Sequence, residues 1–292
     1  MGGLSKEREI SLRSGRAVAL ALKNRGYPVV EIDAGRDLPQ RLAAEKIDQA
    51  VIMLHGRWGE DGTVQGMLEV MGIPYSGSGP LASAISLDKE LTKRIVAQAG
   101  IRTPRWQVIS SKDLQSGVAL SLPLPVIVKP NHEGSTIGIT IVKEMKNLMP
   151  ALAESAKHDA TTLVEEFISG KEITVGIVDG KPLPPLEIVP KSGFYDFQAK
   201  YTKGMTEYIV PARISKEAAR EMTGMTVKVY ELLRLCGIAR ADFILGELPC
   251  FLEVNSIPGM TETSLVPKAA AAVGISFEDL CEFLVKGASL KV

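Results

Sequence analysis

Two β-rich segments near the C-terminus carry the side chains best suited to bind a metal ion. ARADFIL (239–245) and CFLEVN (250–255) are separated by a short GELP turn. Glu253 and Asn255 are two residues apart, so both point to one face of a strand. Asp242 shares that face if the register of the two strands allows it. Two carboxylates and an amide are hard oxygen ligands, which suit Mg²⁺ or Mn²⁺. A hairpin with a polar outward face is the alternative.

A glycine-rich loop between two predicted strands is a candidate phosphate site. PVIVKPNHEGSTIGITIV (125–142) places Lys129 at the end of a strand, followed by Gly134, Ser135 and Gly138. The backbone N–H groups of such a loop can close over phosphates, and Lys129 supplies a point charge. The loop is not a Walker A motif, because the GK[ST] ending and the following helix are missing. An ordinary hairpin turn fits the composition equally well.

Polar residues also follow two other predicted strands. HGRWGEDGTVQG (55–66) comes after an apolar run that ends at Leu54, and ligands of open α/β sheets gather at such strand ends. A lone histidine such as His55 is more often structural than catalytic. Glu7 precedes the first helix, where an acid also stabilises the helix dipole. The acids of VEEFISGKE (164–172) are suited to accept hydrogen bonds from an adenine amine and ribose hydroxyls, or are simply solvated.

The apolar pattern predicts the elements that position these groups. Apolar residues at helical spacing predict a helix over 12–25, and two short β-rich runs predict parallel strands at 28–33 and 49–54. Further helices are expected over 89–99 and 277–285. Alternating helices and strands at the start, followed by strand-rich segments, indicate a mixture of α/β and α+β folds.

Three stretches of different texture predict three domains. We place them at residues 1–86, 87–170 and 171–292. The sequence contains no internal repeat and no low-complexity linker, so the domains are expected to pack together.

Composition excludes several classes of protein. Of 292 residues, 34 are Lys or Arg and 34 are Asp or Glu, which gives a formal net charge of zero. A nucleic-acid partner is therefore not expected, because phosphate neutralisation needs a clustered cationic surplus. Three widely spaced cysteines form neither a disulfide framework nor a zinc pattern. We find no signal-peptide core and no apolar run of about 18 residues, so we expect no membrane association and a cytoplasmic location.

Taken together, the motifs resemble the D-alanine–D-alanine ligases of the ATP-grasp superfamily. The resemblance covers nearly the whole chain in order. The motifs that carry it are GGLSKEREISLRSG, LHGRWGEDGTVQG, GIPYSGSGPLASAISLDKELTK, VKPNHEGSTIG, VEEFISGKE, GFYDFQAKY, ARADF and LEVNSIPGMTETSLVPKAA. The family implies an ATP-grasp fold with an N-terminal Rossmann-like domain, a central domain and a C-terminal domain that carries the metal site and a lid. It also implies ATP and D-alanine as substrates, two Mg²⁺ ions per site with Mn²⁺ as a substitute, a role in peptidoglycan precursor synthesis, and a homodimer.

The resemblance also implies a role for individual residues. The residues it implies for ATP binding are Lys89, Lys129, Gly134, Ser135, Glu165, Glu166, Phe167, Ile168 and Glu172. The implied metal ligands are Asp242, Glu253 and Asn255. The implied catalytic residues are Glu7, Ser135, Tyr201, Arg240 and Gly259. The implied substrate-binding residues are His55, Lys200, Ser264 and Leu265.

The sequence departs from the family at its start. Family members begin with a short apolar strand before the GG turn, whereas Met1 is followed at once by Gly2 and Gly3. We therefore expect an N-terminal domain without its first strand, which leaves neighbouring strands without a partner. Either the natural start lies upstream of Met1 or this domain is trimmed and less stable.

Two other functions remain as alternatives. One is a different ATP-grasp ligase, such as an enzyme that forms D-alanyl-D-lactate, and the other is a non-catalytic nucleotide-binding protein. The residues of the lid predicted over 194–211 include Tyr201 and no histidine, which favours an amine nucleophile over a hydroxyl. We expect this lid to be disordered without nucleotide.

Overall fold

The computed structural model describes residues 1–116, 118–191, 202, 204–261 and 263–292. Its α-helices are α1 (Arg8–Asn24), α2 (Leu38–Ala44), α3 (Thr63–Met71), α4 (Pro80–Leu87), α5 (Lys89–Gln98), α6 (Asp113–Ser116), α7 (Leu148–Ala156), α9 (Lys216–Leu232), α10 (Leu265–Ala271) and α11 (Phe277–Lys286). Its strands are β1 (Trp106–Ser110), β2 (Val126–Pro130), β3 (Thr140–Val142), β4 (Thr161–Glu166), β5 (Lys171–Val178), β6 (Lys181–Pro182), β7 (Leu186–Pro190), β8 (Thr206–Ile209), β9 (Ile238–Leu245) and β10 (Pro249–Asn255).

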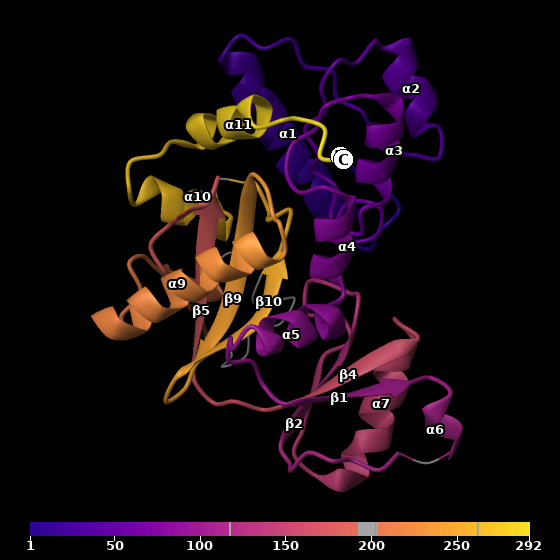
Figure 1. The fold of residues 1–292 in the computed structure, drawn as a ribbon, viewed down its shortest axis with the longest axis vertical. Helices are drawn as coiled ribbons and strands as arrows, with labels where there is room; N and C mark the ends of the chain where they lie inside the picture. The colour runs from indigo at the N-terminus through magenta and orange to yellow at the C-terminus, as the bar shows by residue number, and fades with distance from the viewer. Residues whose placement is uncertain (117, 192–201, 203, 262) are drawn as a thin grey trace.

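A small sheet in the order β1–β4–β2–β3 forms the lower part of the molecule in Figure 1. All its strand pairs are antiparallel. Val126, Val128 and Val164 alternate onto one face, where they pack with residues of α7 in one buried cluster. Lys129 and Glu165 therefore belong to the opposite face.

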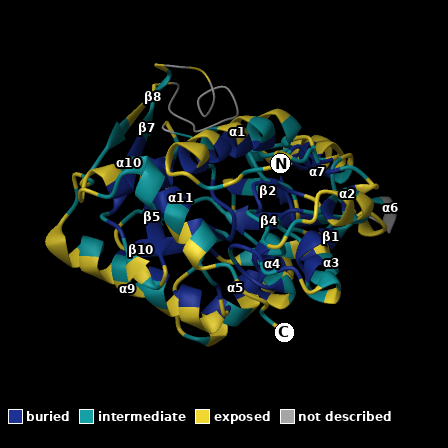
Figure 2. Cartoon of the chain, turned by 90° about the horizontal axis from the view of Figure 1, so that it is seen from above, coloured by how far each residue is buried: buried dark blue, intermediate teal, exposed yellow. Residues whose placement is uncertain are grey.

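A larger sheet of six strands has the order β10–β9–β5–β7–β8, with β6 added beside β5. Its core contains Phe243 and Phe251 from the sheet and Val229 from α9, which covers one face of the sheet in Figure 1. Val96 of α5 belongs to the same cluster. Because α5 also lies next to the small sheet in Figure 1, this helix links the two sheets. Figure 2 shows buried residues along β5 and β10 of the larger sheet and β2 and β4 of the small sheet, and exposed residues along the outer face of α9.

The N-terminal part differs from the prediction of two parallel strands. Residues 28–33 and 49–54 are extended but form no strand, and the parallel pairing left in this region is a single bridge between Ala50 and Tyr75. The backbone of Met1 forms two hydrogen bonds with the segment at 32–34. Its ammonium donates to Ile32 O at 3.1 Å, and its carbonyl accepts from Ala34 N at 2.9 Å. The predicted strands were therefore wrong as ladders, because no continuous strand lies beside them within the described residues.

Most other predicted elements are present. Helix α1 begins four residues earlier than predicted and ends at Asn24, whereas α5 and α11 lie within a residue of their predicted ends. Of the lid predicted over 194–211, residues 194–201 and 203 lie outside the described part of the chain. Residues 206–209 form β8, which pairs with β7 in the larger sheet, so the expectation of disorder was wrong for this part of the lid. Among the described helices, none is both long and apolar enough to cross a membrane.

Candidate active site

The predicted metal ligands lie together on one face of the larger sheet. In the register of β9 and β10, Glu253 is opposite Asp242, and Asn255 is opposite Arg240. The Asn255 side-chain amide donates a hydrogen bond to Asp242 Oδ2 at 3.2 Å. The condition that the prediction placed on the register is therefore met.

A β-bulge at Leu252 decides which side chains of β10 face this site. Phe251 pairs with Phe243, but the next pair is Glu253 with Asp242, so Leu252 is the extra residue. Without the bulge, alternation would put Phe251 and Glu253 on the same face. With it, Phe251 and Val254 both enter the core, while Glu253 and Asn255 face the opposite side.

Arg240 is held beside the ligand pair by a two-pronged ion pair. Its Nε and Nη2 atoms donate to Asp242 Oδ1 and Oδ2, each at 2.8 Å, and Thr174 Oγ1 donates to Asp242 Oδ1 at 2.7 Å. Among the described residues there is no group of three or more His, Cys, Asp or Glu suited to a metal. The donor set here is two carboxylates and one amide, which fits a hard divalent cation that takes its remaining ligands from phosphate and water.

Lys89 joins the metal-ligand strand to the glycine-rich loop. Asp88 caps α5 by accepting a hydrogen bond from Leu91 N at 2.9 Å, which fixes Lys89 in the first turn of the helix. The largely buried Lys89 ammonium donates to Glu133 O at 2.7 Å and lies 3.5 Å from Glu253 Oε2. The start of α5, the glycine-rich loop and β10, which are far apart in the sequence, therefore meet at the Lys89 ammonium.

The glycine-rich loop is not an ordinary tight hairpin turn. It connects β2 to β3, and both Ser135 and Thr136 have left-handed φ angles, of 52° and 62°. Such values are uncommon for residues other than glycine and cluster at ligand-binding segments. At Gly138, where φ is 70°, a Cβ atom would lie 2.9 Å from Pro130 Cγ, so only glycine fits. The loop conformation favours the phosphate-binding interpretation.

Glu7 lies between two glycine loops. It occupies the N-cap position of α1 but its side chain makes no capping bond, which argues against a purely capping role. Its carboxylate instead accepts a hydrogen bond from Ser135 Oγ, and a Cβ atom built on Gly56 would lie 3.0 Å from Glu7 Oε2. Tyr201 and Lys200, the predicted partners of this network, lie outside the described residues.

Two titratable groups with shifted pKa values border Glu7: His55 is buried and Glu60 is half-buried. Burial lowers the pKa of His55, so its imidazole is neutral near pH 7, and among the described residues no group forms a hydrogen bond with its Nε2 atom. Burial, followed by the negative charge of Glu7, raises the pKa of Glu60 to about 8. Glu60 carries no predicted role, although its place after an apolar run was visible in the sequence. Its neighbour Asp61 is structural, since it accepts a hydrogen bond from Thr63 N at 2.9 Å at the start of α3.

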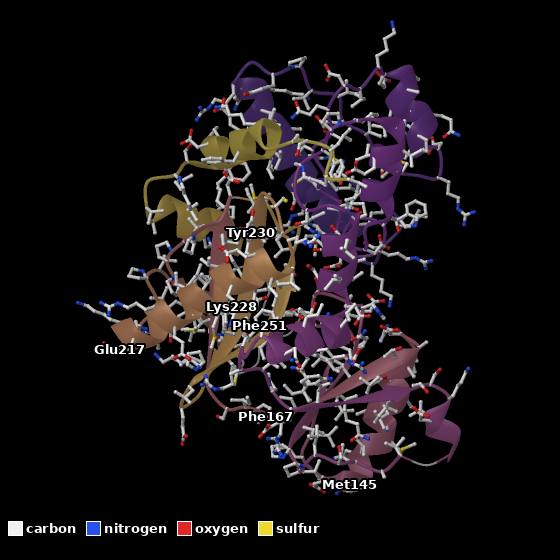
Figure 3. All side chains as sticks on the ribbon, viewed as in Figure 1. Met145, Phe167, Glu217, Lys228, Tyr230 and Phe251 are labelled. Carbon is white, nitrogen blue, oxygen red and sulfur yellow. The ribbon has the colours of Figure 1, made fainter. Side chains whose placement is uncertain are left out.

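The predicted adenine segment lies where the chain passes from one sheet to the other. Glu165 is 1% exposed, and its carboxylate lies 2.6 Å from the Lys129 ammonium. Glu166 pairs with Arg105 at 3.0 Å. Phe167 lies on the link between β4 and β5, between the two sheets in Figure 3. Ile168 follows on the same link, and Glu172 lies on β5 opposite Ile188 and Ile244.

The residues predicted to bind the second substrate surround the start of α10. Ser264 is the N-cap residue of this helix, and its Oγ accepts a hydrogen bond from Thr261 N at 3.0 Å. A Cβ atom on Gly259 would lie 3.1 Å from the same Oγ. Leu265 is buried. The structure thus brings Gly259, Ser264 and Leu265 together, and their roles stay predictions.

His132 gives the glycine-rich loop a pH-dependent attachment. Its ring lies 2.8 Å from Asp159 and 3.2 Å from Asp88. The hydrogen bond to Asp159, together with the charges of Asp159 and Asp88, outweighs burial and raises the pKa of His132 above 6.5. Because the folded-state pKa is raised, the contribution to stability is full below about pH 6.5 and is lost as the pH rises through the folded-state value.

We expect a His132→Gln variant to be less stable than the wild type at about pH 5.5 and nearly equal to it at about pH 9. The difference should stay below about 1 kcal/mol, because the imidazole is 44% exposed. Denaturant unfolding at both pH values measures it. Asp159→Asn should reduce the pH dependence of the difference, leaving the part due to Asp88, and a gap that widens toward high pH would contradict the assignment.

Two family models and several curated relatives match this chain. The model of the D-ala D-ala ligase C-terminus matches residues 95–286, and that of the D-ala D-ala ligase N-terminus matches residues 36–78. A D-alanine–D-alanine ligase from Syntrophotalea carbinolica is 51% identical over 292 residues, which cover 100% of this chain and 95% of that protein. One from Geobacter sulfurreducens is 48% identical, over 100% of this chain and 93% of that protein.

Solved structures show the same fold. The D-alanine–D-alanine ligase from Bacillus anthracis complexed with ATP has a TM-score of 0.86 and 34% identity, covering 98% of this chain and 94% of that one. The VanG D-Ala:D-Ser ligase from Enterococcus faecalis has a TM-score of 0.81 and 28% identity, covering 98% and 97%. With both family models matched and identity extending over the full length, the chain belongs to the D-alanine–D-alanine ligase family and has its ATP-grasp fold.

Proposed function

We propose that this protein joins two D-alanine molecules to D-alanyl-D-alanine, converts ATP to ADP and phosphate, and so supplies a peptidoglycan precursor. The observation that carries the proposal is the meeting of the glycine-rich loop, Lys89 and Glu253 at the junction of the two sheets. This arrangement combines cations for a triphosphate with oxygen ligands for a divalent metal. Family membership adds the substrate class.

ATP is expected to lie between the two sheets. Lys89 and Lys129 would contact its phosphates, and the loop over 132–138 would cover them. The segment from Glu165 to Ile168 would line the adenine, with Glu172 at the ribose. Asp242, Glu253 and Asn255 would hold two Mg²⁺ ions, or Mn²⁺, which would neutralise charge on the phosphates when bound.

The first half of the reaction activates one D-alanine, and different residues would bind the two D-alanine molecules. A carboxylate oxygen of the first D-alanine attacks the γ-phosphorus of ATP, ADP leaves, and an acyl phosphate forms. Glu7, with His55 nearby, would hold the ammonium group of this D-alanine. Ser264 and Leu265 would position the carboxylate of the second.

Bond formation needs stabilisation of a developing oxyanion. The amine of the second D-alanine loses a proton and attacks the acyl carbon, and phosphate leaves as the tetrahedral intermediate collapses. The Arg240 guanidinium and the Gly259 N–H would donate hydrogen bonds to this oxyanion. Water would hydrolyse the acyl phosphate, so the lid over 194–211 would close before it forms.

The choice of the second substrate is assigned to the lid. Tyr201 would join Glu7 and Ser135 in one hydrogen-bonded set, with Lys200 alongside. We expect Tyr201→Phe to reduce the preference for D-alanine over D-lactate as the second substrate by about tenfold, the effect of one lost hydrogen bond. Competition assays with both acceptors, read by product mass, measure this ratio. An unchanged ratio would exclude the network as the basis of specificity.

The decisive experiment is phosphate release from Mg²⁺-ATP with D-alanine, L-alanine, D-serine, D-lactate plus D-alanine, or no amino acid. Release that requires D-alanine, with a product of the mass of D-alanyl-D-alanine, would support the proposal. A D-alanyl-D-lactate or D-alanyl-D-serine product would favour a different ligase of the same family. Nucleotide binding without turnover under any condition would favour the non-catalytic alternative.

Three broader features belong to the same proposal. The domain boundaries are placed at residues 1–86, 87–170 and 171–292, the protein is expected to act in the cytoplasm, and it is expected to form a homodimer. Light scattering coupled to gel filtration measures the mass in solution, and a monomer at micromolar concentration would count against the dimer.

A further inference from the structure

A second, fully buried lysine lies behind the proposed nucleotide site. The side chain of Lys93, on α5, is 0% exposed. Its ammonium donates a hydrogen bond to Thr103 Oγ1 at 2.6 Å and lies 5.3 Å from the centre of the Trp106 ring. Burial of an ammonium is costly without a compensating charge, and no step of the proposed reaction uses Lys93 directly.

Glu165 compensates Lys93, but it also holds Lys129. The Lys93 ammonium lies 2.7 Å from Glu165 Oε1, and the Lys129 ammonium lies 2.6 Å from Glu165 Oε2. In the register of β2 and β4, Glu165 is opposite Ile127, so Lys129 is its diagonal neighbour on the same face. One carboxylate therefore lies between two ammonium groups, with all three residues buried.

The charges of the three groups support this arrangement. Burial tends to raise the pKa of Glu165, but the positive charges of Lys129 and Lys93 outweigh it, and the pKa is lowered. Burial lowers the pKa of Lys93, and Glu165 opposes that effect. With all three groups ionised, the cluster carries one surplus positive charge. A purely structural pair would need one lysine per carboxylate, so the surplus fits a site that receives an anion.

We propose that Lys93 is a positioning residue for the nucleotide, which neutralises Glu165 so that the charge of Lys129 stays available to the phosphates of ATP. The inference rests on the proposed function, since it takes ATP as the ligand. Without Lys93, Glu165 and Lys129 form a closed neutral pair, and the site loses its surplus charge. Affinity for phosphates then falls, whereas recognition of the nucleoside is unchanged.

The test compares ligands that differ only in phosphate charge. Isothermal titration calorimetry measures ATP, ADP and adenosine binding to the wild type and to Lys93→Met, with a fixed Mg²⁺ concentration. We expect the ratio of ATP affinity to adenosine affinity to fall at least about tenfold in the variant, with a smaller fall for ADP. In steady-state assays, the KM for ATP should rise by a similar factor while the KM for D-alanine and kcat change little.

Two further variants separate charge from packing. Val96→Ala removes packing atoms from the same helix at a position that is also 0% exposed, and it should leave the affinity ratio unchanged despite a lower melting temperature. Lys93→Met combined with Glu165→Gln frees Lys129 again. Glu165 is also placed at the adenine, so this double variant is compared only through the ratio of ATP affinity to adenosine affinity, in which a change at the adenine cancels; it should recover much of that ratio. If Lys93→Met does not fold, Thr103→Val should lower the ratio in the same direction by removing the hydroxyl that holds the ammonium.

The possible outcomes have distinct meanings. Equal losses of ATP and adenosine binding in Lys93→Met, or no recovery in the double variant, would overturn the inference and leave Lys93 as a packing residue. An unchanged ratio would overturn it as well. Failure of the wild-type protein to bind ATP at all would instead overturn the proposed function, and the inference with it.

Discussion

An Arg240→Met variant is expected to lose about 10²- to 10³-fold in kcat, with little change in the KM for ATP. The guanidinium is held in one orientation by two hydrogen bonds of 2.8 Å to Asp242, so it is preorganised to donate to a developing oxyanion. The fold should survive the change, because Asp242 keeps its hydrogen bonds from Thr174 and Asn255. Steady-state phosphate release, with product identified by mass, measures the loss.

The matched control is Arg213→Met. Arg213 also pairs with a carboxylate, that of Glu187, but its side chain is 59% exposed and lies outside the proposed site, so activity should be retained. Arg240→Lys should be intermediate, since an ammonium keeps the charge but not the planar fork. A kcat for Arg240→Met within about threefold of the wild type would exclude the oxyanion role.

The largest loss of stability is expected from Phe251→Ala. Phe251 is completely buried in the larger sheet, and its ring meets that of Phe243 edge-on, with centroids 5.9 Å apart. In Figure 3 it lies on the larger sheet, between α9 and α5. Removing such a ring costs about 3–5 kcal/mol, through lost burial and the cavity that remains. Denaturant unfolding at neutral pH measures the change in the free energy of unfolding.

Phe283→Ala provides the comparison for this loss. Phe283 is on α11 with 43% of its surface exposed, and its removal should cost less than about 1 kcal/mol. Phe251 is two residues from Glu253, so loosening of the core around position 251 would also disturb the site. The Phe251→Ala variant should therefore lose activity as the temperature approaches its melting point. A Phe251→Ala protein as stable as Phe283→Ala would mean that the core relaxes around the missing ring.

Local pattern was sufficient for the strands that carry the site. β9 and β10 were predicted within a residue of their observed ends, because both segments are rich in β-forming residues and are bounded by turn residues. The strands predicted at 28–33 and 49–54 do not form, since a parallel strand depends on a neighbouring strand that the pattern within the segment does not reveal. These two segments therefore make no strand ladder despite their β-forming composition.

The same distinction applies to the site. The order of the motifs identified Lys89, Glu253 and Ser135 as site residues, and the structure shows their contacts. Glu165 and Lys129 were identified in the same way, but their shared contact with Lys93 was not predictable. Lys93 lies four residues after Lys89 on one helix, where a lysine normally reads as solvated surface. Only the packing of α5 against the small sheet reveals that it is buried. The functional roles of all these residues stay predictions until they are tested.

The bulge at Leu252 makes the site sensitive to the length of β10 as well as to its composition. In the pairing of β10 with β9, Leu252 has no partner, whereas Phe251 and Glu253 on either side of it are paired. Deletion of Leu252 would make Phe251 and Glu253 direct neighbours on opposite faces, so Glu253 and Asn255 would keep both their side of the sheet and their partners on β9. Deletion of Val254 would instead turn Asn255 toward the core, so the effect of losing one residue from this strand depends on whether the bulge can absorb the loss.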